Sequence, residues 1–197
     1  MPFDPDLPAQ VEEADERNWR LLRNIRYQAR ERPFLAEAGM CTDFASVPRV
    51  FVWLLPRYGR YTRAAIVHDH LWRQEVPNRA LTLKDADGIF RRASRELGVP
   101  FLQRWVMWAA VRWGGVMKGG LRQISWWIDL PRVLLVSVLV APIVLPPALL
   151  VGIGYGAFVV VESVLWLVLL VGKVLGRLLR VERPDKVVNP PKVSWKL

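Results

Sequence analysis

Sulfur and imidazole side chains are scarce in this sequence. Cys41 is its one cysteine, so the chain cannot form an internal disulfide, which fits a reducing compartment. Residues 1–6 lack both the basic segment and the apolar run of a signal peptide, so we expect the protein to begin on the cytoplasmic side. Zinc-ligand spacing, a Gly-rich phosphate loop and the aromatic pattern of RNA-binding strands are missing as well, so nucleic acid is not an expected partner.

Charge is missing from a long C-terminal stretch. Residues 133–161 contain no charged side chain, and the apolar run continues past Glu162 to residue 172. As a helix, residues 133–172 would measure about 60 Å, whereas one membrane crossing takes about 20 residues. Because three prolines interrupt the first half and basic residues flank both ends, we expect a transmembrane or re-entrant helical hairpin with both ends in the cytoplasm. Its turn is expected between residues 145 and 156; a buried hairpin of a soluble protein is the alternative.

Positive charge and tryptophan, in contrast, are abundant. The formal net charge is +10, and the chain has 10 tryptophans. A positive balance favours a partner with an anionic surface, and the apolar run favours lipid over nucleic acid. Trp126 and Trp127, followed by Arg132 directly before the apolar run, are typical of an anchor at a membrane interface. A phospholipid membrane is therefore the expected partner.

Charge order and apolar spacing predict a mainly α fold. Acidic residues begin the segment 9–32 and arginines fill its later turns, which complements a helix dipole and predicts a charged helix. This helix is expected to be either simply solvated or in contact with anionic lipid or a partner. Further helices are expected from about residue 58 to 73, after a capping box at Thr82 and Asp85, and from about 101 to 113. The expected divisions are an N-terminal arm and charged helix (1–38), a helical core (39–117), an interfacial linker (118–132), the hairpin (133–172) and a basic tail (173–197).

The two histidines of the chain flank one aspartate, in His68-Asp69-His70. On a helix, His68 and Asp69 point about 100° apart, so they can do different jobs. Two antiparallel helices joined by a short loop would bring His68 opposite Asp87, which could accept from Nδ1–H and leave Nε2 as a general base. Asp43 and Asp69 could supply hard oxygen ligands for Ca²⁺. A cation beside an aligned base suits ester hydrolysis by an activated water, because the cation stabilises the oxyanion.

Several segments between residues 39 and 115 resemble known families. The segments are Thr42-Asp43-Phe44, Tyr58-Gly59, Ala64-Ala65-Ile66-Val67-His68-Asp69, Asp87-Gly88-Ile89-Phe90 and Trp108-Ala109-Ala110-Val111-Arg112. Together they resemble the small prokaryotic phospholipase A2 enzymes. The run Thr-Asp-Phe-Ala-Ser-Val-Pro and the motif His-Asp-x-Leu-Tyr resemble more closely a family of unknown function found in phages and prophages. In this chain Trp72 stands where that motif has Tyr, and the disulfides of secreted phospholipases are absent.

The resemblance implies a small phospholipase A2-like helical core and a role for each matched residue. His68 would be the base that activates water, and Asp87 would orient it. Asp43 and Asp69 would bind Ca²⁺, with the carbonyl of Phe44 as a third ligand. Other phage proteins are the further partners that the resemblance implies, together with association with the virion.

Three functions follow as hypotheses. The first is a membrane-anchored, calcium-dependent lipid hydrolase of phage or prophage origin. The second is a non-catalytic membrane or virion accessory protein that keeps the same scaffold. The third is a zinc hydrolase that uses His68 and His70; two residues apart on a helix, these side chains point about 200° apart and cannot easily share one metal.

Overall fold

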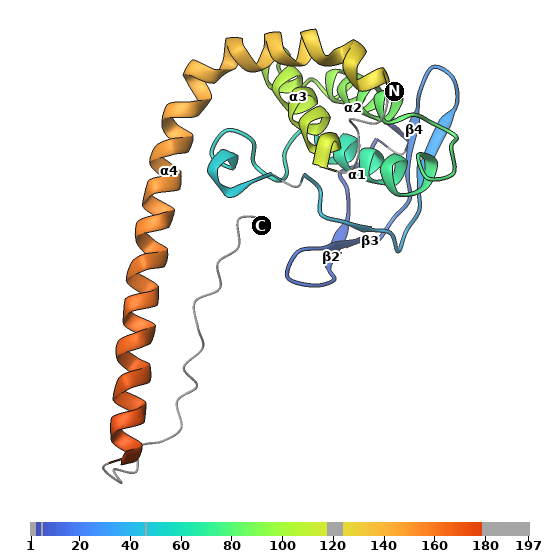
Figure 1. Cartoon of the computed structure of the whole chain (residues 1–197). Helices are drawn as coiled ribbons and strands as arrows, with labels where there is room; N and C mark the ends of the chain where they lie inside the picture. The colour runs from blue at the N-terminus through green and yellow to red at the C-terminus, as the bar shows by residue number, and fades with distance from the viewer. Residues whose placement is uncertain (1–2, 5, 46, 118–123, 179–197) are drawn as a thin grey trace.

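The computed structural model describes residues 3–4, 6–45, 47–117 and 124–178 of the chain. Within them the fold is mixed and mostly helical, with two small antiparallel sheets followed by four α-helices (Figure 1). The first sheet has the order β1-β4-β5, with β1 at Phe3–Asp4, β4 at Ile25–Gln28 and β5 at Pro33–Ala36. The second has the order β2-β3-β6, with β2 at Val11–Glu13, β3 at Trp19–Leu21 and β6 at Cys41–Thr42.

Strands and turns occupy residues 9–32, so the predicted charged N-terminal helix is wrong. Along β4 the side chains of Ile25 and Tyr27 are buried. Those of Arg26 and Gln28, which alternate with them, are exposed. This period of two is that of a strand, and burial of its apolar face outweighs the favourable order of charges for a helix dipole.

An aspartate turn closes the hairpin between β2 and β3. Asp15 Oδ1 accepts hydrogen bonds from the backbone N–H groups of Arg17 at 2.8 Å and Asn18 at 2.9 Å. The hydrogen bond from the Asn18 side chain, and secondly these two backbone bonds, hold the pKa of Asp15 below its usual value. Aspartate competes well for backbone donors in turns, so the acidic residues that suggested a helix start serve a turn here.

Three helices follow: α1 (Thr62–His70), α2 (Leu83–Glu96) and α3 (Phe101–Met117). Helix α1 packs against β4 and β5, α2 packs against α1, and α3 packs against α2. A short π-helical turn, η2 (Leu71–Glu75), extends α1. Their apolar sides share one core with both sheets, in which Leu21, Tyr27, Ile66 and Leu71 are almost completely buried. Burial of these large side chains is the main stabilising contribution to this part of the chain.

The expected start of α2 is confirmed. Thr82 Oγ1 accepts from the backbone N–H of Asp85, and Asp85 Oδ2 accepts from that of Thr82, both at 3.2 Å, which forms the predicted capping box. The chain leaves the helix at Gly98, whose φ of +74° favours glycine. Before α1, residues Arg49–Phe51 form a 3₁₀ helix, η1.

Residues 124–178 form one helix, α4 (Ile124–Leu178), and the predicted hairpin is not present. The helix lies over α2 and α3 at its start, bends, and then projects away from the rest of the molecule (Figure 1). Four prolines lie inside it, at positions 131, 142, 146 and 147, and proline removes a helix hydrogen bond and favours a bend. The expected turn does not form between residues 145 and 156. This segment is rich in proline and glycine, but Tyr155 is its one polar side chain, so a turn here would leave backbone groups without hydrogen-bond partners.

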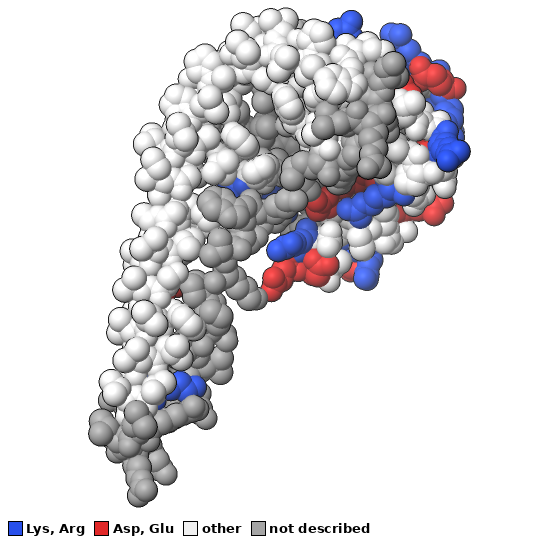
Figure 2. Space-filling view, in the orientation of Figure 1, with Lys and Arg blue, Asp and Glu red and all other residues white. Residues whose placement is uncertain are grey.

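Helix α4 is apolar and largely uncovered. Charged side chains gather on the sheets and the shorter helices, whereas the visible face of α4 is nearly free of them (Figure 2). Among the described residues it is the one helix long and apolar enough to cross a membrane, an inference from length and composition. The core helix of a soluble protein would meet the same criterion but would be mostly buried, whereas 17% of the most apolar window here is buried.

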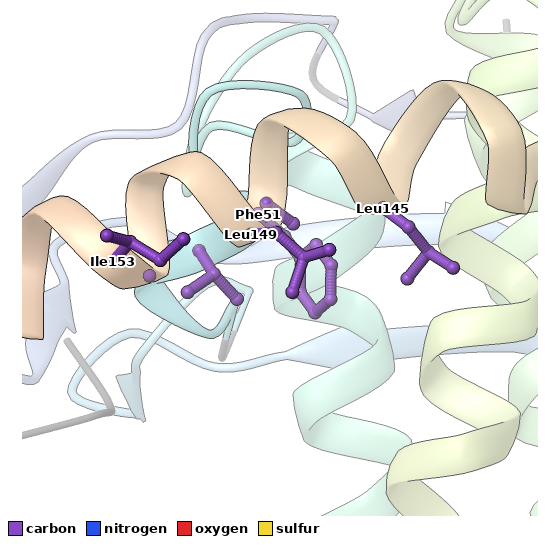
Figure 3. A pocket seen from close by; sticks show the side chains of 7 residues that line it. Phe51, Leu145, Leu149 and Ile153 are labelled. Atoms are coloured by element: carbon purple, nitrogen blue, oxygen red, sulfur yellow. The ribbon is translucent and has the colours of Figure 1, made fainter.

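The middle of α4 also contacts η1. Leu145, Leu149 and Ile153 extend from α4 toward Phe51 of η1 and line an apolar crevice of about 430 Å³ (Figure 3). The expected interfacial linker is helical from residue 124 onward, as the first turns of α4, and its residues 118–123 lie outside the described part of the chain. Of the expected basic tail, residues 173–178 belong to α4 and residues 179–197 lie outside the described part.

Candidate active site

His68 and Asp87 meet between two neighbouring helices. His68 lies near the end of α1 and Asp87 in the second turn of α2, and the two helices pack together. His68 Nε2 lies 2.8 Å from Asp87 Oδ1, as the antiparallel arrangement predicted. The nitrogen involved is Nε2 rather than the expected Nδ1, so Nδ1 is the atom left to take a proton. The His68 ring also packs against Phe90, with 5.0 Å between ring centroids, and its side chain is 12% exposed.

Two residues that the sequence analysis did not assign to the site complete the surroundings of Asp87. Trp72 Nε1 donates to Oδ1 at 3.3 Å, and Arg112 Nη1 donates to Oδ2 at 3.1 Å. The Asp87 side chain is 1% exposed, so these donors and His68 replace the water that a carboxylate would otherwise bind. Trp72 stands where the motif has Tyr, and both side chains donate a hydrogen bond, tryptophan through its indole N–H and tyrosine through its phenol O–H. This motif position was therefore one signal for the contact.

The Thr42–Phe44 turn lies against the same end of α1. Thr42 Oγ1 donates to Asp69 Oδ2 at 2.5 Å, and the backbone N–H of Phe44 donates to Thr42 Oγ1 at 3.0 Å. Phe44 has a φ of +58°, a strained value for a residue with a side chain. The three bonded groups therefore hold the turn that carries Asp43 and the Phe44 carbonyl beside Asp69.

Asp69 and Asp43 are close enough to repel one another. Burial is the main cause that raises the pKa of Asp69 to about 7, and the charge of Asp43 raises it further. Asp43 Oδ1 also lies 3.6 Å from Arg73 Nη2, which offsets part of its negative charge. Two neighbouring carboxylates are chemically suited to a hard divalent cation.

These residues fit Ca²⁺ by the chemistry of their donors. Within the described residues no three His, Cys, Asp or Glu side chains form a cluster that could hold a metal. A calcium ion would thus depend on Asp69 and Asp43 together with carbonyl oxygens such as that of Phe44 and with water, a set within the range that calcium accepts. The assignment of Ca²⁺ to these residues stays a prediction.

His70, the other histidine, faces different neighbours. Its Nε2 lies 3.7 Å from Glu75 Oε1, and burial lowers the pKa of its imidazole. His68 is bonded to Asp87 on α2, so the two imidazoles have separate partners. The pair therefore gives no support to a shared zinc ion.

Residues 19–111 of the chain match the model of a family described as protein of unknown function, DUF1353. The matched segment contains β3 to β6 and α1, α2 and most of α3, and with them His68, Asp69 and Asp87. It excludes α4. No curated protein and no solved structure matches the chain.

Proposed function

We propose that this protein is a membrane-anchored hydrolase of phospholipid esters, of phage or prophage type, with His68 as general base and Asp87 as the residue that orients it. The observation that carries the proposal is the 2.8 Å contact between His68 Nε2 and a buried Asp87 whose other oxygen is bonded to Arg112. A histidine held in this way keeps one ring nitrogen for proton transfer.

In this mechanism Asp87 accepts from His68 Nε2–H and fixes the tautomer in which Nδ1 is the basic nitrogen. Nδ1 then takes a proton from a water molecule as that water attacks the ester carbonyl, and later returns it to the leaving alcohol. A calcium ion bound by Asp69, Asp43 and the Phe44 carbonyl would polarise the carbonyl and stabilise the developing oxyanion. His68 and Asp69 are consecutive on α1, which supports placing the base and the cation on adjacent sides of one substrate.

Lipid is the substrate class that the rest of the chain supports. Most of the large side chains of α4 beyond Asp129 are apolar and exposed, among them Leu139, Leu150 and Val161. A helix of this kind suits a bilayer, and it is covalently continuous with the segment that carries the site. Anchoring would therefore hold the site next to phospholipid ester bonds, and the resemblance of the Thr-Asp-Phe-Ala-Ser-Val-Pro run supports the phage or prophage origin.

The test is release of fatty acid by the purified full-length protein from vesicles of mixed phospholipids. We expect activity with Ca²⁺ that is abolished by a calcium chelator and restored by added calcium. His68→Asn should lower the rate by about 10²- to 10⁴-fold, the usual contribution of a general base. His70→Asn is the matched control, because it removes the other imidazole, and it should keep most of the activity if its tryptophan fluorescence is that of the unchanged protein. No fatty acid release, or release that survives His68→Asn, would exclude the proposal.

A second candidate is a non-catalytic membrane or virion accessory protein. It is favoured by the number of groups that share Asp87: besides His68, the donors Trp72 and Arg112 come from η2 and α3, so the carboxylate also joins these elements. Under this function His68→Asn leaves the biological phenotype intact, whereas deletion of residues 133–172 abolishes it.

A further inference from the structure

A chain of buried charged side chains joins the candidate site to helix α4. Beyond Asp87, the guanidinium of Arg112 continues to Asp129 in the second turn of α4, with 3.6 Å between Nη2 and Oδ2. The side chains of Arg112 and Asp129 are 2% and 4% exposed. His68, Asp87, Arg112 and Asp129 thus lie on α1, α2, α3 and α4 respectively, and each contacts the next.

The outer end of this chain reaches solvent. Lys84 Nζ and Arg132 Nη1 lie 3.9 Å and 3.6 Å from Asp129 Oδ1, and their side chains are 40% and 71% exposed. The backbone around Arg112 is fixed as well, because Trp126 Nε1 of α4 donates to its carbonyl at 3.2 Å. Two separate contacts from the first turns of α4 therefore act on Arg112.

We propose that Arg112 is a positioning residue for His68, acting through Asp87, and that Asp129 of α4 positions Arg112. The beginning of the apolar helix is on this view part of the site as well as its anchor. The catalytic consequence rests on the proposed hydrolase function, whereas the positioning itself does not.

The geometry of arginine carries this inference. One guanidinium nitrogen, Nη1, binds Asp87, and the other, Nη2, faces Asp129, so the planar group is fixed at both ends. Arg112 in turn fixes the plane of the Asp87 carboxylate, because it donates to Oδ2 while His68 and Trp72 occupy Oδ1. Without Asp129, the guanidinium loses its second anchor, and the orientation of Asp87 toward His68 Nε2 is less well held.

The presence of just two histidines makes this positioning measurable. We would label the full-length protein with ¹⁵N-histidine in lipid nanodiscs and record the imidazole signals of His68 and His70. In the unchanged protein we expect His68 to show a hydrogen-bonded Nε2–H that exchanges slowly with water, and an unprotonated Nδ1. Asp129→Asn should raise the exchange rate of that hydrogen by about tenfold, since local opening governs such exchange. Fatty acid release should fall in the same variant through kcat rather than KM.

Two further variants separate positioning from general loss of structure. Arg132→Gln also removes a contact to Asp129, but from an exposed side chain, and should change the His68 exchange rate by less than about twofold. Arg112→Lys keeps the charge but not the two-armed geometry, and should raise exchange while the His70 signals stay in place.

The proposal is overturned if Asp129→Asn and Arg112→Lys, with unchanged His70 signals, leave the His68 Nε2–H as slow to exchange as before. It is also overturned if the unchanged protein shows no protected Nε2–H. If the variants behave as expected but the protein releases no fatty acid, the positioning stands and the hydrolase function falls.

Discussion

The domain formed by residues 3–117 and the helix α4 handle charge in opposite ways. The domain buries charged groups in its interior, at Asp87 and Arg112, and pairs them. From residue 133 to residue 172, α4 has a single charged residue, Glu162, and leaves most of its large apolar side chains exposed. Among the described residues of α4, Asp129 is the one buried charged side chain, and it lies where the helix meets the domain.

The proposed membrane anchoring accounts for this difference by two environments for one chain. Pairing of buried charges is expected where water is excluded by protein, because an isolated charge there is very unfavourable. Exposed apolar surface over many turns is expected where the surroundings are apolar. The contact between Arg112 and Asp129 therefore lies at the boundary between a domain that pairs its buried charges and a helix with an exposed apolar surface.

The largest expected effect comes from breaking the polar region at its centre. Arg112→Met leaves both Asp87 and Asp129 buried without their shared cation, and should lower the free energy of unfolding by about 3–5 kcal/mol. Arg26→Met, on the exposed face of β4, is the control and should change it by less than about 0.5 kcal/mol. Urea unfolding followed by tryptophan fluorescence measures both. Equal effects of the two substitutions would mean that burial of the pair does not matter.

A charge placed on α4 should weaken membrane insertion and leave the stability of the domain unchanged. Leu165→Lys puts a cation on the exposed apolar part of the helix and should weaken membrane insertion by about 2.5–3.5 kcal/mol, the cost of lysine at the centre of a spanning helix. Because residue 165 is remote from the domain core, the unfolding of the domain should not change. Flotation with vesicles and urea unfolding measure the two quantities, and Leu165→Val is the control. Undiminished flotation of Leu165→Lys would argue against a bilayer around this part of the helix.

The cap at the start of α2 should contribute less to the free energy of unfolding. Thr82→Ala removes the oxygen that caps the helix and should lower the free energy of unfolding by about 1 kcal/mol. Thr82→Ser keeps that oxygen and should retain most of the stability. Thermal unfolding of both variants tests this, and identical melting temperatures would mean that the capping box contributes nothing.

The features that the sequence predicted well depend on neighbouring residues or on a single pair of helices. The capping box at Thr82 is decided by neighbouring residues, and it was confirmed. The contact between His68 and Asp87 was predicted because a short loop between two helices leaves few ways to arrange them. The roles given to Asp43, Asp69 and the Phe44 carbonyl stay predictions.

What the sequence predicted poorly depends on partners far along the chain. The strand β4 is stable because it pairs with β1 and β5, and no local pattern in residues 9–32 identifies those partners. Arg112 belongs to a segment that carries the resemblance, but its place between Asp87 and Asp129 depends on the packing of α3 against both α2 and α4. The hairpin prediction assumed that prolines and glycines make a turn. In a segment with apolar side chains, however, the backbone groups are best satisfied by the hydrogen bonds of a continuous helix.

The smallest expected effect is an alkaline change confined to the domain. Burial, and secondly the hydrogen bond from Tyr27 Oη to Glu96 Oε2 at 2.9 Å, raise the pKa of Tyr27 far above its usual value. A group whose pKa is raised in the folded state contributes its stability below the pKa of the unfolded chain, which is about 10 for tyrosine. That contribution should therefore decline as pH rises above about 10. Tyr27→Phe should flatten the fall in the free energy of unfolding between about pH 9.5 and 11, relative to the unchanged protein.

Tyr61, whose pKa is also raised by burial, should account for a separate part of that fall, so Tyr61→Phe is the matched comparison. Because the group that titrates lies in the domain core, the helicity of α4 in vesicles should stay constant over the same range, and parallel loss of both signals would show that the two regions do not respond independently.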